Sequence, residues 1–209
     1  MRFVWPLFVL LASSTGLLAQ SRYEIDGNTL TLDMTVAAPG YDFDGGLDAY
    51  NETEVISYLF DHPEIKTLRV TGPGGYGPAA RAISDYLLRH SINTVAFGEC
   101  YSACARIFLG GKSRMLAPGA TLGFHRPWIV KESEKRFYEA NRIKEKWEEE
   151  FDYVPWIYDV AIGDVVEGLT FLRSRDVEMD FILKIYSTSS YDIWEPSRDE
   201  LLEAGVLTE

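Results

Sequence analysis

The sequence has no excess of basic residues. Its 20 lysines and arginines face 32 aspartates and glutamates, which gives a formal net charge of -12 at pH 7. A surface of this sign repels the phosphates of nucleic acids, and it repels anionic membrane surfaces for the same reason. We therefore expect no nucleic-acid partner and no anionic lipid surface.

Long apolar runs are scarce as well. Residues 1–20 (MRFVWPLFVLLASSTGLLAQ) contain a basic Arg2, an apolar run from Phe3 to Ala12 and small residues leading to Ala19. The run is too short to span a bilayer with ease, so we predict a secretory signal peptide cut near Ala19, with an uncut anchor as the alternative. Residues 21–209 would then form a periplasmic or secreted domain without a membrane span.

Cysteine is rare, with two in 209 residues, so the fold must rest on an apolar core rather than on a disulfide framework. In an oxidising compartment Cys100 and Cys104 would pair. Two free buried cysteines are the alternative, because residues four apart on a helix do not always reach disulfide geometry. Carboxylates at 42, 44 and 48 lack the spacing of a calcium loop, so we expect no metal.

Periodicity predicts a single α/β domain with a mainly parallel sheet and a helical C-terminal half. A hairpin turns at residues 26–29, and strands are expected at 66–71, 93–97, 114–116 and 121–124. Helices are expected at 53–60, 78–89, 102–109, 131–151, 154–173, 177–186 and 196–204.

Residues 72–77 (GPGGYG) match the pattern G-x-G-x-x-G of dinucleotide-binding loops. Pro78 moves the helix start past the third glycine, and an exported protein meets few soluble dinucleotides, so we expect no cofactor. Glycines in this loop can instead direct free N–H groups into a site, as an oxyanion hole requires. Gly74 and Gly75 are the candidates for that role.

Ser102 and His125 are candidates for a nucleophile and its base. Ser102 lies between a predicted strand and a helix, where a serine is either a helix N-cap or an exposed nucleophile. Of the three histidines, His62 and His90 end helices, whereas His125 follows a strand and has no such role. The amide of Ala103 would face the same place as those of Gly74 and Gly75.

The order of motifs resembles the proteolytic subunit of the Clp protease. Pro-Gly-Gly follows a strand, Gly-x-x-x-Ser opens a helix, and Ala-Pro and His-Arg-Pro come later. The chain is still more similar to exported proteins related to that subunit, in which Cys-x-Ser-x-Cys surrounds the serine. The resemblance covers residues 68–127 and returns at residues 190–208.

A place in this ClpP/crotonase superfamily implies a spiral of ββα units. It also implies that Ser102 is the nucleophile, His125 the general base and Asp192 its orienting carboxylate, with Gly75 and Ala103 as oxyanion amides. Members of the family often form homo-oligomers through the helix after the histidine, here residues 131–151.

The chain departs from the family pattern in several respects. The interval from His125 to Asp192 is longer than in the cytoplasmic subunit, an exported chain has no ATP-driven unfoldase, and Lys112 lies off the motif of a serine-lysine dyad. The other carboxylates that could complete a triad are Asp159, Asp164, Asp176 and Asp180.

We expect an exported serine hydrolase, of the peptidase class, acting on a peptide or protein. The alternative is a non-catalytic binding or assembly module that uses the aromatic residues Trp147 and Phe151. Crotonase-like acyl-thioester chemistry is a weaker third possibility, because an exported protein is not expected to meet a coenzyme A substrate.

Overall fold

A computed structural model of the chain describes residues 21–37, 46–48 and 51–208. The predicted signal peptide, residues 1–20, and the carboxylates at 42 and 44 lie outside the described residues. In the described part no helix is long and apolar enough to cross a membrane. No group of residues there could hold a metal ion.

The sheet is mostly parallel, as the sequence predicts. Strands β1 (Tyr23–Asp26) and β2 (Thr29–Asp33) form an antiparallel hairpin, and β2 pairs in parallel with β3 (Thr67–Gly72). Strand β3 pairs in parallel with β4 (Asn93–Tyr101), which is parallel to both β5 (Arg114–Leu116) and β6 (Thr121–Gly123). The hairpin turn contains Gly27, whose φ of 56° suits a glycine.

Strand β4 is longer than predicted and ends next to Ser102. The pattern indicated residues 93–97, because Gly98 looks like the end of a strand. Gly98 instead has a φ of 58° within the strand, and the register of β3 against β4 shifts between Val70 and Gly72. This bulge carries the chain on to Tyr101, where it pairs with Gly123 of β6.

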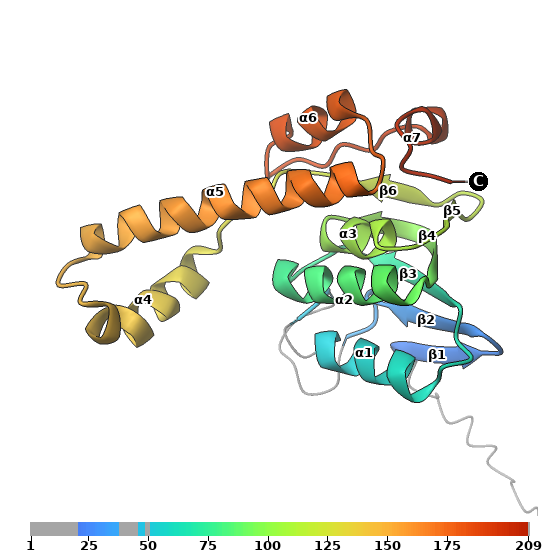
Figure 1. The fold of residues 1–209 in the computed structure, drawn as a ribbon, viewed down its shortest axis with the longest axis horizontal. Coiled ribbons are helices and arrows are strands. Elements are labelled where there is room, and N and C mark those ends of the chain that lie inside the picture. Colours follow the sequence, from blue (N-terminus) through green and yellow to red (C-terminus); the bar gives the residue numbers. More distant parts are fainter. Residues whose placement is uncertain (1–20, 38–45, 49–50, 209) are drawn as a thin grey trace, which may run out of the picture.

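Three helices accompany the strands in chain order. They are α1 (Asn51–Asp61), α2 (Gly77–His90) and α3 (Ala103–Leu109), and they succeed one another along the sheet as the strands do (Figure 1). Alternation along β2 buries Leu30 and Leu32, which join Ile83 of α2 and Phe108 of α3 in one core. This core holds the carboxyl ends of β3 and β4 in place, where the candidate site lies.

The C-terminal half is helical, with α4 (Lys131–Glu145), α5 (Glu150–Ser174), α6 (Met179–Ser187) and α7 (Arg198–Glu203). The 25 residues of α5 span about 37 Å. Its first half and α4 project from the body as an arm (Figure 1). The base of α5 returns to the body beside α3.

The predicted helix boundary inside the arm was wrong. A single helix over residues 131–151 was expected, but α4 ends at Glu145, and the next residue, Lys146, has a φ of 60°. Helix α5 then starts behind a reciprocal capping box made by Glu149 and Asp152. The turn lets Tyr138, Trp147 and Tyr153 pack together at the tip of the arm, whereas Phe151 stays exposed.

Candidate functional site

Ser102 makes the turn between β4 and α3 by itself, because the strand ends at Tyr101 and the helix begins at Ala103. Its backbone has φ 56° and ψ -119°, a region that residues other than glycine rarely adopt. Two other residues with positive φ, Ser91 and Lys146, are ordinary left-handed helix ends. Ser102 makes no side-chain cap hydrogen bond, so helix capping does not explain it.

The neighbours of Ser102 define its position. Its N–H donates to the carbonyl oxygen of Gly123 (2.9 Å), and its own carbonyl accepts from the N–H of Arg106 (3.1 Å). A Cβ on Gly74 would lie 2.8 Å from the Ser102 Cβ and 2.8 Å from the Ala103 nitrogen. The glycine loop therefore touches the serine turn, and at a φ of 101° Gly74 is the residue that permits this approach.

The two cysteines form a disulfide across this turn, with their Cα atoms 5.1 Å apart. Cys100 belongs to β4 and Cys104 to α3, and neither side chain is exposed. The bond therefore joins a strand to a helix, which is why the spacing of residues within a helix left the pairing open.

Two of the three proposed oxyanion amides, those of Gly74 and Gly75, lie in the glycine loop. Leu47 pairs with Gly75, since the Leu47 N–H donates to the Gly74 oxygen (2.6 Å) and the Tyr76 N–H donates to the Leu47 oxygen (2.8 Å). Within the described residues the N–H groups of Gly74 and Gly75 donate to no acceptor. The Ala103 N–H, in the first turn of α3, has no acceptor inside the helix. Three N–H groups are thus free for a ligand.

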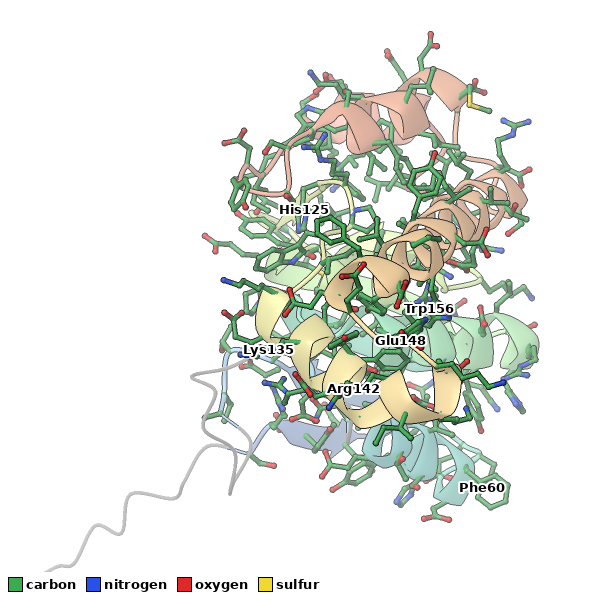
Figure 2. All side chains as sticks on the ribbon, turned by 90° about the vertical axis from the view of Figure 1, so that its left-hand side faces the viewer. Phe60, His125, Lys135, Arg142, Glu148 and Trp156 are labelled. Atoms are coloured by element: carbon green, nitrogen blue, oxygen red, sulfur yellow. A yellow bond between two sulfur atoms is a disulfide. The ribbon has the colours of Figure 1, made fainter. Side chains whose placement is uncertain are left out.

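His125 lies two residues beyond the carbonyl that binds Ser102. Its Nδ1–H donates to the carbonyl oxygen of Arg126 (2.7 Å), because a carbonyl can only accept. In the neutral ring this leaves Nε2 as an acceptor. No hydrogen bond joins Ser102 to His125 in the described part of the chain. Figure 2, viewed with the arm toward the reader, shows His125 above Lys135 of α4.

Asp192 comes from a segment that runs beside His125. Phe124 and Trp194 exchange two backbone hydrogen bonds of 2.9 Å, which aligns residues 192–194 with residues 124–126. The Asp192 carboxylate is exposed and makes no hydrogen bond to any described residue. Among the alternatives, Asp164 forms an ion pair with Arg81 (2.8 Å). The structure brings the Asp192 segment to the histidine, but not its carboxylate to the imidazole.

Sequence reasoning missed Gly123 and Tyr101. A Cβ on Gly123 would lie 2.4 Å from the Tyr101 ring and 2.6 Å from Ile193, so a glycine is needed where these segments meet. Burial raises the pKa of Tyr101, whose hydroxyl lies 3.2 Å from Thr121 Oγ1. The glycine in the apolar strand was a signal for close contact, but the sequence does not identify the neighbour.

Helix α3 is also fixed from its other side. Arg106 donates to both oxygens of Glu167 in α5 (2.7 and 3.2 Å), and its guanidinium lies 3.4 Å from the ring centroid of Phe171. Arg81 of α2 lies 3.7 Å from the same carboxylate. This ion-pair cluster seats the base of the arm against the helix that starts after Ser102.

A hollow of about 620 Å³ lies elsewhere, on the surface of α4. It is lined by Glu132, Lys135, Arg136, Glu139 and Ala140, none of which is a candidate site residue. The lining of this hollow consists mainly of charged side chains from one exposed helix. It therefore indicates a functional site less strongly than the backbone geometry around Ser102 does.

No family model matches the chain, and no curated protein matches it. Solved structures, however, do match the fold of the chain. ClpP1 from Listeria monocytogenes, in a mutant form, has a TM-score of 0.51 and 16% identity over 87% of this chain and 89% of its own. A mutant of the membrane-bound stomatin-specific protease 1510-N has a TM-score of 0.51 and 12% identity over 86% of this chain and 75% of its own.

A protein assigned as an enoyl-CoA hydratase from Streptomyces coelicolor has a TM-score of 0.50 and 14% identity over 95% of this chain and 71% of its own. Identities this low establish similarity of fold alone. The three similar structures carry names of different kinds on one architecture.

Proposed function

The chain has the ClpP/crotonase fold, and on this fold we propose that it is a serine hydrolase of the peptidase class, acting on a peptide or protein. The observation that carries the proposal is the backbone of Ser102. Strained conformations concentrate at catalytic turns, and serine nucleophiles often sit on sharp strand-to-helix turns that expose Oγ. One of the similar structures is named as a stomatin-specific protease and another as ClpP1, which supports the peptidase class.

In this proposal Ser102 Oγ attacks the substrate carbonyl and passes its proton to Nε2 of His125. The Arg126 carbonyl supports this role, because it holds the proton on Nδ1 and leaves Nε2 to accept. The amides of Gly75 and Ala103, with Gly74, would bind the developing oxyanion. Their lack of recorded acceptors is consistent with that assignment.

Closing the dyad requires Ser102 Oγ and His125 Nε2 to come within hydrogen-bond reach of each other. Catalytic hydrogen bonds are often long in ligand-free enzymes and tighten when substrate binds. Asp192 is our proposed orienting carboxylate, supported by the pairing of Phe124 with Trp194; in the closed dyad it would replace the Arg126 carbonyl as the acceptor of the His125 Nδ1–H. We expect Asp192→Asn to lower the acylation rate more than tenfold, and Asp180→Asn to leave it unchanged. Equal rates in both variants would remove Asp192 from the mechanism.

Fluorophosphonate labelling tests the function directly. The folded wild type should be labelled, Ser102→Ala should not, and Ser133→Ala, which changes an exposed serine of α4, should label like the wild type. A folded wild type that resists the probe would contradict the proposal.

Export to the periplasm or the outside is part of the proposal, although residues 1–20 lie outside the described residues. The Cys100–Cys104 disulfide supports it, because such bonds persist in oxidising compartments and are rare in the cytosol. A fusion of residues 1–20 to a reporter enzyme that is active only after export should give activity. Reporter activity equal to that of a leaderless fusion would contradict export.

We also propose that a second copy of the chain covers the arm. Phe151, Val154, Tyr158, Ile162 and Val166 recur every three or four residues of α5 and are all exposed. This spacing puts them on one helix face, and an apolar stripe of this length suits a protein interface. The whole stripe lies on α5, and only Phe151 falls within residues 131–151, the helix from which assembly was expected. Light scattering should give a mass above 23.7 kDa.

The second candidate function is a non-catalytic binding or assembly module on the same fold. The missing Ser102–His125 hydrogen bond and the aromatic tip of the arm favour it. It predicts that Ser102→Ala and His125→Ala keep the biological activity, while changes at Trp147 or Phe151 abolish it. The hydrolase proposal predicts that Ser102→Ala and His125→Ala abolish the activity, and that changes at Trp147 or Phe151 affect it less.

A further inference from the structure

The Cys100–Cys104 disulfide encloses the candidate nucleophile. Its loop contains Tyr101, Ser102 and Ala103, and the bond joins the end of β4 to the first turn of α3. Within this loop Ser102 has the positive φ of 56°. A covalent bond across three residues restricts the backbone angles that they can adopt together. It can therefore maintain a conformation that an open chain seldom populates.

The position of the disulfide does not suit thiol–disulfide exchange. Thiol–disulfide exchange requires an attacking thiolate to reach one of the sulfurs. Cysteines that take part in such reactions are partly exposed, whereas Cys100 and Cys104 are both 0% exposed. The role of this bond therefore lies in the shape that it gives to the turn.

The other contacts of the turn leave Ser102 a route to relax. The N–H of Ser102 is held by Gly123, and Gly74 touches its Cβ from one side. Neither contact prevents rotation about ψ of Ser102 toward an ordinary value, and that rotation would move the Ala103 N–H and the start of α3 relative to Ser102 Oγ. The disulfide opposes it, because it fixes the distance between the residues on both sides.

We propose that the Cys100–Cys104 disulfide is a positioning element of the site, which holds Ser102 in its strained conformation and thereby sets the rate of acylation. This inference rests on the proposed hydrolase function. The two cysteines touch no substrate atom; they act through the backbone of Ser102.

A double-mutant cycle separates the bond from the packing of its sulfurs. Cys100→Ala, Cys104→Ala and the double variant all lack the bond, so each should react with a fluorophosphonate about 100-fold more slowly than the wild type, and all three alike. If the sulfurs act only by packing, the two single effects should multiply in the double variant. Three variants that react at the wild-type rate would also overturn the proposal.

Two further readouts separate positioning from general loss of stability. The pH dependence of the rate should keep its midpoint in the variants while the plateau falls. Val55→Ala removes buried core volume in α1, away from the turn, and should lower the melting temperature without slowing the reaction. A matching loss of rate in Val55→Ala would assign the effect to stability.

A measurement without catalysis keeps the inference distinct from the hydrolase proposal. Amide hydrogen exchange of a peptide covering residues 99–106 should speed up in all three cysteine variants at temperatures where they remain folded. Unchanged exchange would refute the positioning role even if the wild type is a hydrolase. Faster exchange in the cysteine variants, combined with a wild-type protein that no probe labels, would refute the hydrolase proposal alone.

Discussion

Gly74→Ala is the most informative single change at the site. The added Cβ would lie 2.7 Å from the Tyr101 oxygen, 2.8 Å from the Ala103 nitrogen and 2.8 Å from the Ser102 Cβ. All three are shorter than ordinary contacts, and two of the atoms belong to the backbone, which cannot swing aside. Gly74 also has a φ of 101°, which an alanine adopts only under strain.

The close contacts of the added Cβ and the backbone strain at Gly74 together should lower the stability of the protein considerably. Backbone strain costs about 1–3 kcal/mol and a forced contact in a packed region a similar amount, so we expect a loss of about 2–6 kcal/mol in the free energy of unfolding. For a chain of this size that corresponds to a fall of at least about 4 °C in Tm. The relief of the contact should displace the Ser102 turn, and a displacement of about 1 Å lowers the acylation rate about 100-fold.

Gly77→Ala is the matched control in the same loop. Gly77 is the first residue of α2, and nothing lies within 4 Å of a Cβ placed there. An alanine at this position should leave the acylation rate unchanged and change stability by less than about 1 kcal/mol, because the stiffer unfolded chain is offset by the crowding of a Cβ before Pro78. Thermal unfolding by circular dichroism and the fluorophosphonate rate give both quantities. A Gly74→Ala protein as stable and as reactive as Gly77→Ala would refute the contact between the glycine loop and the serine turn.

Three further predictions concern stability and assembly. Glu167→Gln weakens the pair with Arg106, and since Glu167 is 41% exposed we expect a loss of only about 1 kcal/mol in urea unfolding, against less than about 0.5 kcal/mol for Glu139→Gln in an exposed pair on α4. Burial, followed by the Glu54 carboxylate, raises the pKa of Tyr23 above its ordinary 10.0 in the folded state. Stability should therefore be complete below about pH 10 and fall as the pH rises beyond it, because only the unfolded chain then loses the proton; an equally steep decline in Tyr23→Phe would contradict this cause. Ile162→Glu places a charge in the apolar stripe of α5 and should give a monomer in light scattering, whereas Asp159→Glu should not; an Ile162→Glu protein with the wild-type mass would remove the stripe from the interface.

Much of the fold follows from periodicity in the sequence. The hairpin at Gly27 and the alternation of strands and helices up to residue 124 come from patterns that local chemistry determines. The extension of β4 could not be predicted in this way, since a glycine such as Gly98 occurs both at the end of a strand and at a bulge within one. The break after α4 was missed because its capping box uses Glu149, which is an unusual N-cap residue.

The site also has parts that the sequence predicts and parts that only the structure identifies. Ser102, His125 and the glycine loop stand out in the sequence because their residue types carry chemistry. The Arg126 carbonyl at His125 and the Gly123 carbonyl at Ser102 could not be predicted, because backbone groups occur at every residue and only folding selects them. The disulfide became definite only when the structure put Cys100 on a strand and Cys104 on a helix.

The central claim is that Ser102 is a nucleophile, and the position of a covalent adduct tests it most directly. Wild-type protein that has reacted with a fluorophosphonate should be reduced, digested and sequenced by tandem mass spectrometry. We predict one adduct, on the Ser102 side chain, with its yield abolished by prior unfolding of the protein. An adduct on another residue, or none on the folded protein, would contradict the account.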